Sequence, residues 1–162
     1  MGGSAAGTAA RLARMPGRGE VISIHLRPRS KLVGAPVPSA RVEAGRGLVG
    51  DRYHAPGGAA EGEALTLIEQ EALEALRADT GIALSHADSR RQVLTRGLRL
   101  NELVGREFSI GDVRCLGVEL CEPCVHLQSL TRPGVLDGLV HRGGLRCDVL
   151  SDGEIAVGSP IG

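Results

Sequence analysis

The sequence predicts a mainly β protein, a closed or partly open β-barrel with a few short helices. Apolar residues make up 42% of the 162-residue chain, but Tyr53 and Phe108 are the only aromatic ones, so the core must be aliphatic. The 24 glycines stand beside short apolar runs, a pattern typical of β folds with many turns. A chain of this length fits one domain that can bury a core without disulfides or metals.

The first 19 residues differ in composition from the rest. Residues 1–19 are small, glycine-rich and free of acidic side chains, which is typical of a disordered tail, with a weak transit peptide as the alternative. Residues 20–162 are predicted to form the single domain. Val21, Ile22 and Ile24 predict its first strand, and a proline-spaced loop over residues 28–38 follows.

A second strand is predicted over residues 40–44, immediately before a glycine-rich segment. That segment, Gly45-Arg-Gly-Leu-Val-Gly50, matches the dinucleotide-binding fingerprint letter for letter. The fingerprint requires a helix that begins at the last glycine, whereas residues 51–54 lead into a Pro-Gly-Gly turn. We therefore reject a dinucleotide site here.

One helix is predicted clearly, over residues 69–78. Thr66 and Glu69 can form a capping box at its start, and Gly81 can end it in a left-handed cap. Its buried stripe would consist of Ala72, Leu73 and Leu76.

Short apolar runs alternate with glycine turns after a polar stretch over residues 85–92. The runs are predicted to be strands or strand-sized pieces, over residues 98–104, 108–110 and 113–120. Near the end of the chain, Asp152-Gly153 separates two apolar runs in a pattern that predicts a β-hairpin over residues 145–157.

Charge and hydropathy exclude several kinds of partner. The 19 basic and 19 acidic residues balance, so no long-range field would hold the protein on nucleic acid or an anionic membrane. No apolar run approaches the roughly 18 residues that a membrane-spanning helix needs. The four cysteines occur without a secretory segment, which predicts reduced thiols and a cytoplasmic location.

Cys121-Glu-Pro-Cys124 is the most informative short motif. Two thiols at this spacing can exchange as a dithiol, supply half of a zinc site, or leave one cysteine as a lone ligand or nucleophile. No second cysteine pair completes a zinc site, and redox motifs of this type open a helix, whereas a β-like remainder is expected here. The remaining alternative is that both cysteines simply pack as small hydrophobic residues.

Several further segments, taken together in their order and spacing, resemble MOSC domains over about residues 20–162. They are Gly47-Leu-Val-Gly-Asp-Arg-Tyr-His54, Leu65-Thr-Leu-Ile-Glu69, Arg90-Arg91, Asn101-Glu-Leu-Val-Gly105, Phe108-Ser-Ile-Gly111, Cys121-Glu-Pro-Cys124, Gly143-Gly-Leu-Arg146 and Val157-Gly158. The resemblance implies a barrel like that of pyruvate kinase. Members of this family stand alone or form part of molybdenum-cofactor sulfurases and of molybdenum-dependent reductases of N-hydroxylated compounds.

The resemblance also implies site residues. In those reductases the second cysteine of the motif binds molybdenum, which here falls on Cys124. Arg52 matches an arginine that contacts the cofactor, and Arg90 and Gln92 fall on an Arg-x-Asn segment in which glutamine replaces the family's asparagine. Gln92 keeps the amide's donors and acceptor but adds a methylene group.

Two more residues, Ser30 and Lys31, fall near a loop that contacts the cofactor in the family. Lys31 is the only lysine, and because it lies in a predicted loop, no pyridoxal phosphate is expected. The chemistry of a pterin cofactor agrees with the other residues, since its phosphate needs arginines and its soft metal accepts a thiolate.

Three functions therefore follow as hypotheses. In the first, Cys124 binds a molybdenum cofactor that reduces a small N-hydroxylated substrate, with a protein as the electron donor. In the second, Cys124 carries sulfur as a persulfide between a donor and an acceptor protein. In the third, Cys121 and Cys124 exchange as a dithiol.

Overall fold

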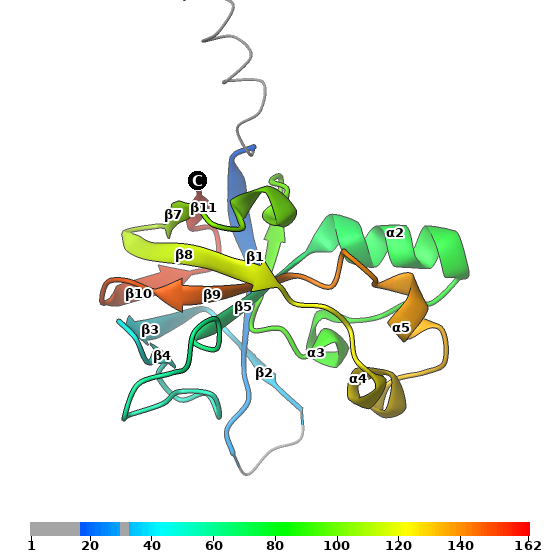
Figure 1. Ribbon diagram of the computed structural model, residues 1–162, viewed down its shortest axis with the longest axis horizontal. Coiled ribbons are helices and arrows are strands. Elements are labelled where there is room, and N and C mark those ends of the chain that lie inside the picture. The colour runs from blue at the N-terminus through cyan, green and yellow to red at the C-terminus, as the bar shows by residue number, and fades with distance from the viewer. Residues whose placement is uncertain (1–16, 30–32) are drawn as a thin grey trace, which may run out of the picture.

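Seven strands close into a barrel in the computed structural model, which describes residues 17–29 and 33–162 (Figure 1). Around the barrel the order is β1, β6, β5, β9, β8, β7 and β11, and β11 pairs again with β1. Their bounds are Gly19–Leu26 (β1), Leu65–Glu69 (β5), Val93–Arg96 (β6), Glu107–Ile110 (β7), Val113–Leu120 (β8), Leu145–Val149 (β9) and Pro160–Ile161 (β11). The predicted β-barrel is confirmed.

One pair of neighbouring strands in the barrel is parallel. β5 and β6 run side by side with Leu67 opposite Val93. A parallel pair needs a crossover connection, and here it consists of α2 (Gln70–Thr80) and α3 (His86–Ser89). The arrangement brings the residues before β6 next to the start of β5, where the pocket described below opens.

A smaller sheet packs beside the barrel and corrects one prediction. Its strands are β3 (Ser39–Glu43), β4 (Gly47–Leu48) and β10 (Gly153–Ala156), in the order β10-β3-β4. The predicted hairpin between β9 and β10 is wrong, because β9 already has β5 and β8 on its two sides and β10 pairs with β3. The Asp152 carboxylate accepts a hydrogen bond from the Ala44 backbone N–H at 2.7 Å, which ties the connection to β3.

The barrel interior is filled by aliphatic side chains, as the composition predicts. The fully buried ones include Ile24, Leu65, Leu67, Val93, Leu100, Ile110, Leu145 and Ile155. Each such side chain stabilises the fold by roughly 1.5–3 kcal/mol relative to an exposed one. The barrel is therefore a packed core and the site must lie at its rim.

A second apolar cluster joins the helices on one side of the barrel (Figure 1). It contains Leu76, Ile82, Leu84, Leu127, Val135 and Leu139, from α2, the loop after it, α4 (Val125–Leu130) and the segment of α5 (Val135–Gly138). The Gln128 Oε1 atom accepts hydrogen bonds from the Gly134 and Leu136 backbone N–H groups at 3.2 and 3.0 Å. These contacts fix α4, and with it the cysteine motif that precedes it.

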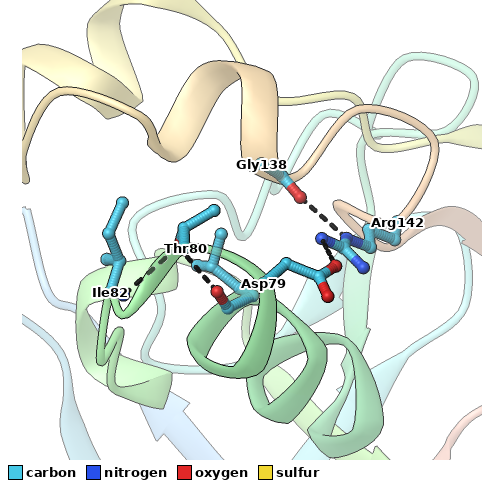
Figure 2. Close-up of polar contacts among 6 residues, drawn as sticks. Asp79, Thr80, Ile82, Gly138 and Arg142 are labelled. Carbon is cyan, nitrogen blue, oxygen red and sulfur yellow. Dashed lines mark hydrogen bonds and ion pairs between the residues drawn. The ribbon is translucent and has the colours of Figure 1, made fainter.

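Polar contacts hold α5 on α2, as Figure 2 shows. The Arg142 guanidinium donates to the Gly138 carbonyl oxygen at 2.7 Å and to the Asp79 carboxylate at 2.9 Å. Thr80, at the end of α2, donates its hydroxyl to a carbonyl oxygen of its own helix and accepts the Ile82 backbone N–H. The end of α2 is thereby joined to the loop after α5.

The predicted helix is confirmed with one correction. α2 ends at Gly81, whose φ of 77° is left-handed and whose N–H donates to the Arg77 carbonyl oxygen at 2.8 Å. The capping box is wrong, because Thr66 lies inside β5 and its hydroxyl accepts the Gln92 backbone N–H at 3.1 Å. The Thr66 hydroxyl, which the local pattern assigned to the helix cap, therefore contacts the segment before the neighbouring parallel strand β6 instead.

Other local predictions also require correction. Residues 98–104 do not form the predicted strand but contain the short 3₁₀ helix η1 (Leu100–Leu103). Its buried residues Leu100 and Leu103 match the three-residue spacing of such a helix. The predicted loop over residues 28–38 contains the short strand β2 (Ala35–Val37), which pairs with β1, and the polar stretch contains α3. The predicted tail lies outside the described residues up to residue 16, and β1 begins at Gly19. None of the described helices could cross a membrane.

Candidate functional site

A pocket of about 440 Å³ lies at the barrel rim, a volume in the range of small-molecule sites. Its walls come from the turn after β4, the start of β6 and the segment between β8 and α4. The basic and thiol side chains that line it are Arg52, Arg90, Arg91, Arg146, Cys121 and Cys124. One wall of the pocket thus carries sulfur and the rest is rich in guanidinium groups.

The structure brings together four of the residues that sequence reasoning singled out. Cys124, Arg52, Arg90 and Gln92 all line the pocket, although they come from three separate segments of the chain. Ser30 and Lys31 lie outside the described residues.

Cys124 is exposed and stands at the N-terminal cap of α4. Its Sγ atom accepts the Leu127 backbone N–H at 3.4 Å, a contact that stabilises negative charge on the sulfur. The expected β-like segment after the motif is wrong, because α4 begins directly at Val125. The motif therefore does open a helix, but this helix lies between the antiparallel strands β8 and β9 and not in the βαβ unit that is typical of such redox motifs.

Cys121 is buried at the end of β8, with 4% of its surface exposed, and it faces the same pocket. Its backbone N–H donates to the Gly144 carbonyl oxygen at 2.8 Å. A side chain at Gly143 would meet the Cys121 carbonyl oxygen at 2.5 Å, so the close approach of these two segments requires glycine. Small molecules reach Cys121 only through the pocket, whereas Cys124 is exposed at the surface.

Arg91 holds this arrangement together and was not predicted as a separate functional residue. Its guanidinium is buried and donates to the carbonyl oxygens of Gly143, Cys121 and Ser89, at 2.8, 2.9 and 3.1 Å. These three carbonyls belong to the ends of three different segments. Neighbouring Arg90 has a left-handed backbone (φ 61°) that is uncommon for a residue other than glycine and lines the pocket.

Asp51 organises the turn that carries Arg52. Its buried carboxylate accepts the backbone N–H groups of Arg27 and Tyr53, at 2.8 and 3.1 Å, and the Gln92 side-chain amide at 2.8 Å. A carboxylate that binds its own turn is the usual reason for aspartate at such a position. The next residue, Arg52, is half-buried and its guanidinium lies 5.5 Å from the centre of the Tyr53 ring.

Gln92 is largely engaged within the protein. Its side-chain oxygen accepts the Thr66 backbone N–H at 2.9 Å while its nitrogen donates to Asp51. The extra methylene group relative to asparagine lets one side chain reach both partners. The amide therefore has one N–H left with which to contact a ligand.

A smaller pocket, of about 20 Å³, adjoins the large one and shares Tyr53, Arg90, Arg91 and Gln92 with it. Its other walls include His25, Arg27 and Asp51. Nothing in the sequence pattern distinguished His25 and Arg27 as site residues.

Two imidazole rings, those of His25 and His86, meet beside this smaller pocket with centroids 4.1 Å apart and ring planes tilted by 45°. The His86 Nε2 atom must carry the proton, because it contacts the Arg91 carbonyl oxygen at 2.8 Å and a carbonyl only accepts. The Nδ1 atom then accepts from the Ser23 hydroxyl. Burial and the neighbouring His25 lower the pKa of His86 to about 4, so this ring is neutral near pH 7.

The two remaining cysteines lie in the barrel core. Burial raises the pKa of Cys115 to about 12 and that of Cys147 well above its usual value. Both thiols are therefore protonated and unreactive in the folded protein. Within residues 17–29 and 33–162, no group of three histidine, cysteine or acidic side chains is arranged to hold a metal ion.

Comparison with known proteins gives a family match and several similar folds. A family model described as the MOSC domain matches residues 44–162. The structure of the YuaD protein from Bacillus subtilis is 15% identical, with a TM-score of 0.76 over 91% of this chain and 97% of that one. YiiM from Geobacillus stearothermophilus is 18% identical, with a TM-score of 0.68 over 88% and 73% of the two chains.

YiiM from Escherichia coli is 17% identical, with a TM-score of 0.63 over 91% of this chain and 68% of that one. At these identities the likeness concerns the fold. No curated protein sequence matches this chain.

Proposed function

Because this chain belongs to the MOSC domain family, which is linked to molybdenum-cofactor functions, we propose that the large pocket binds a molybdenum cofactor through Cys124. The observation that carries the proposal is that the exposed Cys124 thiol lines the same pocket as Arg52 and Arg90. A Cys124 thiol buried among apolar side chains, away from both arginines, would have excluded this proposal.

The residues present fit such a cofactor chemically. A thiolate is the type of ligand that a soft metal prefers, and the N–H of Leu127 supports negative charge on Cys124. Guanidinium groups bind phosphate in a bidentate manner, and Arg52 and Arg90 line the pocket in which the cofactor's phosphate would bind. The pocket volume of about 440 Å³ accommodates a ligand of this size class.

The proposed reaction is the reduction of small N-hydroxylated compounds. When bound, the cofactor would supply two electrons, which with two protons convert an N–O bond into an amine and water. Cys124 would hold the metal, the arginines would fix the anionic end of the cofactor, and Arg91 would keep the Cys121 segment in place. The electrons would come from a donor protein, in a reducing, cytoplasmic setting that agrees with the free thiols of all four cysteines.

Metal analysis tests this proposal directly. The protein is produced in a host that synthesises the cofactor, and molybdenum is measured per chain in the wild type, Cys124→Ser and Cys121→Ser. We expect near one molybdenum per chain, lost in Cys124→Ser and retained in Cys121→Ser. Wild-type protein without molybdenum, or a Cys124→Ser variant that keeps it, contradicts the proposal.

Sulfur transfer is a second candidate, and the exposure of Cys124 beside an N–H donor favours it. A persulfide on Cys124 would need no metal and would be handed from a donor to an acceptor protein. The test is sulfur released by cyanide from the purified protein, which Cys124→Ser should abolish and Cys115→Ser should not.

A third candidate, dithiol exchange, is supported by α4, which follows the cysteine motif directly, and by the position of both cysteines in the lining of one pocket. Here Cys121→Ser and Cys124→Ser should reduce activity equally in an insulin-reduction assay. Unequal loss would argue for the single-cysteine functions.

A further inference from the structure

Arg27 is a buried cation with no ion pair to a carboxylate in the described part of the chain. The residue comes directly after β1 in the chain, and only 7% of its surface is exposed. Among the residues that the structure describes, no carboxylate lies within ion-pair distance of its guanidinium, and its Nη1 atom has no hydrogen-bond partner. Its Nη2 atom lies 3.5 Å from the Tyr53 hydroxyl, at the limit of a hydrogen bond.

A buried charge of this kind is costly, and arginine cannot avoid the cost by losing its proton. The nearest candidate for neutralisation is Asp51, which lines the same small pocket. Its two oxygen atoms are occupied by the backbone N–H groups of Arg27 and Tyr53 and by the Gln92 amide. Among the described residues the guanidinium of Arg27 therefore makes no hydrogen bond to a carboxylate. It lies 5.7 Å from the centre of the Tyr53 ring and lines the small pocket, where an anion would meet it.

A second nitrogen atom without a partner belongs to a residue that lines the same pocket. The Nδ1 atom of His25 is also buried and without a hydrogen-bond partner among the described residues. Arg90 lines the pocket as well, and Tyr53 and Gln92 belong to the walls of both pockets. Two buried nitrogen atoms of the residues lining the small pocket, Arg27 Nη1 and His25 Nδ1, thus have no hydrogen-bond partner among the described residues. The small pocket shares walls with the pocket of Cys124.

We propose that the small pocket binds a phosphate-type oxyanion, with Arg27 as its main charge partner and His25 as a second donor. Its volume of about 20 Å³ holds roughly one oxyanion group or one or two waters. The anion has two possible sources: free phosphate, or the phosphate ester end of a larger ligand that fills the large pocket. The inference does not depend on metal binding at Cys124.

Calorimetric titration of the full chain tests the proposal with two ligands, inorganic phosphate and guanosine monophosphate, each against sodium chloride at matched ionic strength. Arg27→Met keeps the length of the aliphatic stem and removes the charge, and Arg29→Met changes an exposed arginine in the same segment. We expect wild type and Arg29→Met to bind each ligand with the same affinity. Arg27→Met should bind at least about tenfold more weakly.

The two ligands distinguish the sources of the anion. Tighter binding of guanosine monophosphate than of phosphate indicates an ester that spans both pockets, and equal binding indicates a site for the free ion. Absence of binding for both ligands, or equal binding by wild type and Arg27→Met, overturns the proposal. These outcomes do not depend on the molybdenum content. The titrations can therefore be interpreted even if the cofactor proposal is wrong.

A measurement on wild-type protein covers the case in which Arg27→Met does not fold. The imidazole nitrogens of His25 can be followed by NMR during the phosphate titration, with exposed His141 as the internal control. Phosphate should shift the His25 signals and leave those of His141 in place. Unchanged His25 signals would contradict an anion beside this ring.

Discussion

The guanidinium of Arg91 donates to the carbonyl oxygen of Cys121 at 2.9 Å, which links the start of β6 to the strand that carries the cysteine motif. The same group also binds the carbonyls of Gly143 and Ser89. One buried side chain therefore holds the ends of three segments together. The geometry around Cys124 depends on it.

Replacement of Arg91 by methionine should destabilise the protein strongly. Three buried carbonyl groups would lose a charge-assisted donor, so we expect the free energy of unfolding to fall by about 3 kcal/mol. Urea denaturation at neutral pH measures the change. The control is Arg99→Met, an exposed arginine paired with Glu102 on the surface, for which the change should stay within about 0.5 kcal/mol.

The four thiols should differ widely in reactivity. Iodoacetamide should modify Cys124 first because it is exposed, and Cys121 later because it is reached only through the pocket. Cys115 and Cys147 should react only after unfolding, since burial raises their pKa and blocks access. Peptide mass spectrometry over a time course gives the order, and early modification of Cys115 would show that the barrel opens.

His86 should make the protein less stable in mild acid. Its folded pKa, about 4, is below the unfolded value near 6.5, so as pH falls through this window the unfolded chain takes up a proton that the folded chain does not. This loss in the free energy of unfolding reaches about 3 kcal/mol at pH 4 and is absent above pH 6.5. Urea midpoints should therefore depend less on pH in His86→Asn than in wild type, with His141→Asn as the exposed control.

Glu69 should act in the opposite direction. Burial, with Glu71 nearby, raises its pKa to about 7 from 4.5, so the folded chain holds a proton that the unfolded chain loses as pH rises through this window. The stabilisation that the protonated Glu69 gives the folded chain is thus lost as the pH rises from 4.5 to 7. Glu69→Gln should raise the free energy of unfolding by about 1–2 kcal/mol at pH 8, allowing for partial exposure, and change little at pH 4.

For that variant, denaturation curves at the two pH values form the measurement. The glutamine keeps an oxygen for the Leu100 backbone N–H that contacts Glu69, so a loss of stability at both pH values would contradict the prediction. Replacement of exposed Glu74, on the same helix, by glutamine is the matched control.

Much of the fold could be predicted because it follows from short-range patterns. Gly81 ends α2 since a left-handed residue is cheapest as glycine, and the first strand follows from Val21, Ile22 and Ile24. The aliphatic composition of the core and the barrel class were likewise readable from the chain. The meeting of Cys124, Arg52 and Arg90 in one pocket agrees with the grouping expected from the family resemblance.

Other features depended on partners far away in the chain. The segment after the cysteine motif is helical because Leu127 packs with Val135 and Leu139, and neither contact is visible in the local pattern. β10 pairs with β3 because both sides of β9 are already taken.

By itself, the sequence determined the fold class and the family, because residue type and local spacing carry that information. Only the tertiary structure decided which polar groups are satisfied. Gln92 is engaged with Thr66 and Asp51, while Arg27 is buried with its Nη1 atom left without a hydrogen-bond partner among the described residues. Burial and pairing are properties of contacts between distant segments, and they exist only once the chain has folded.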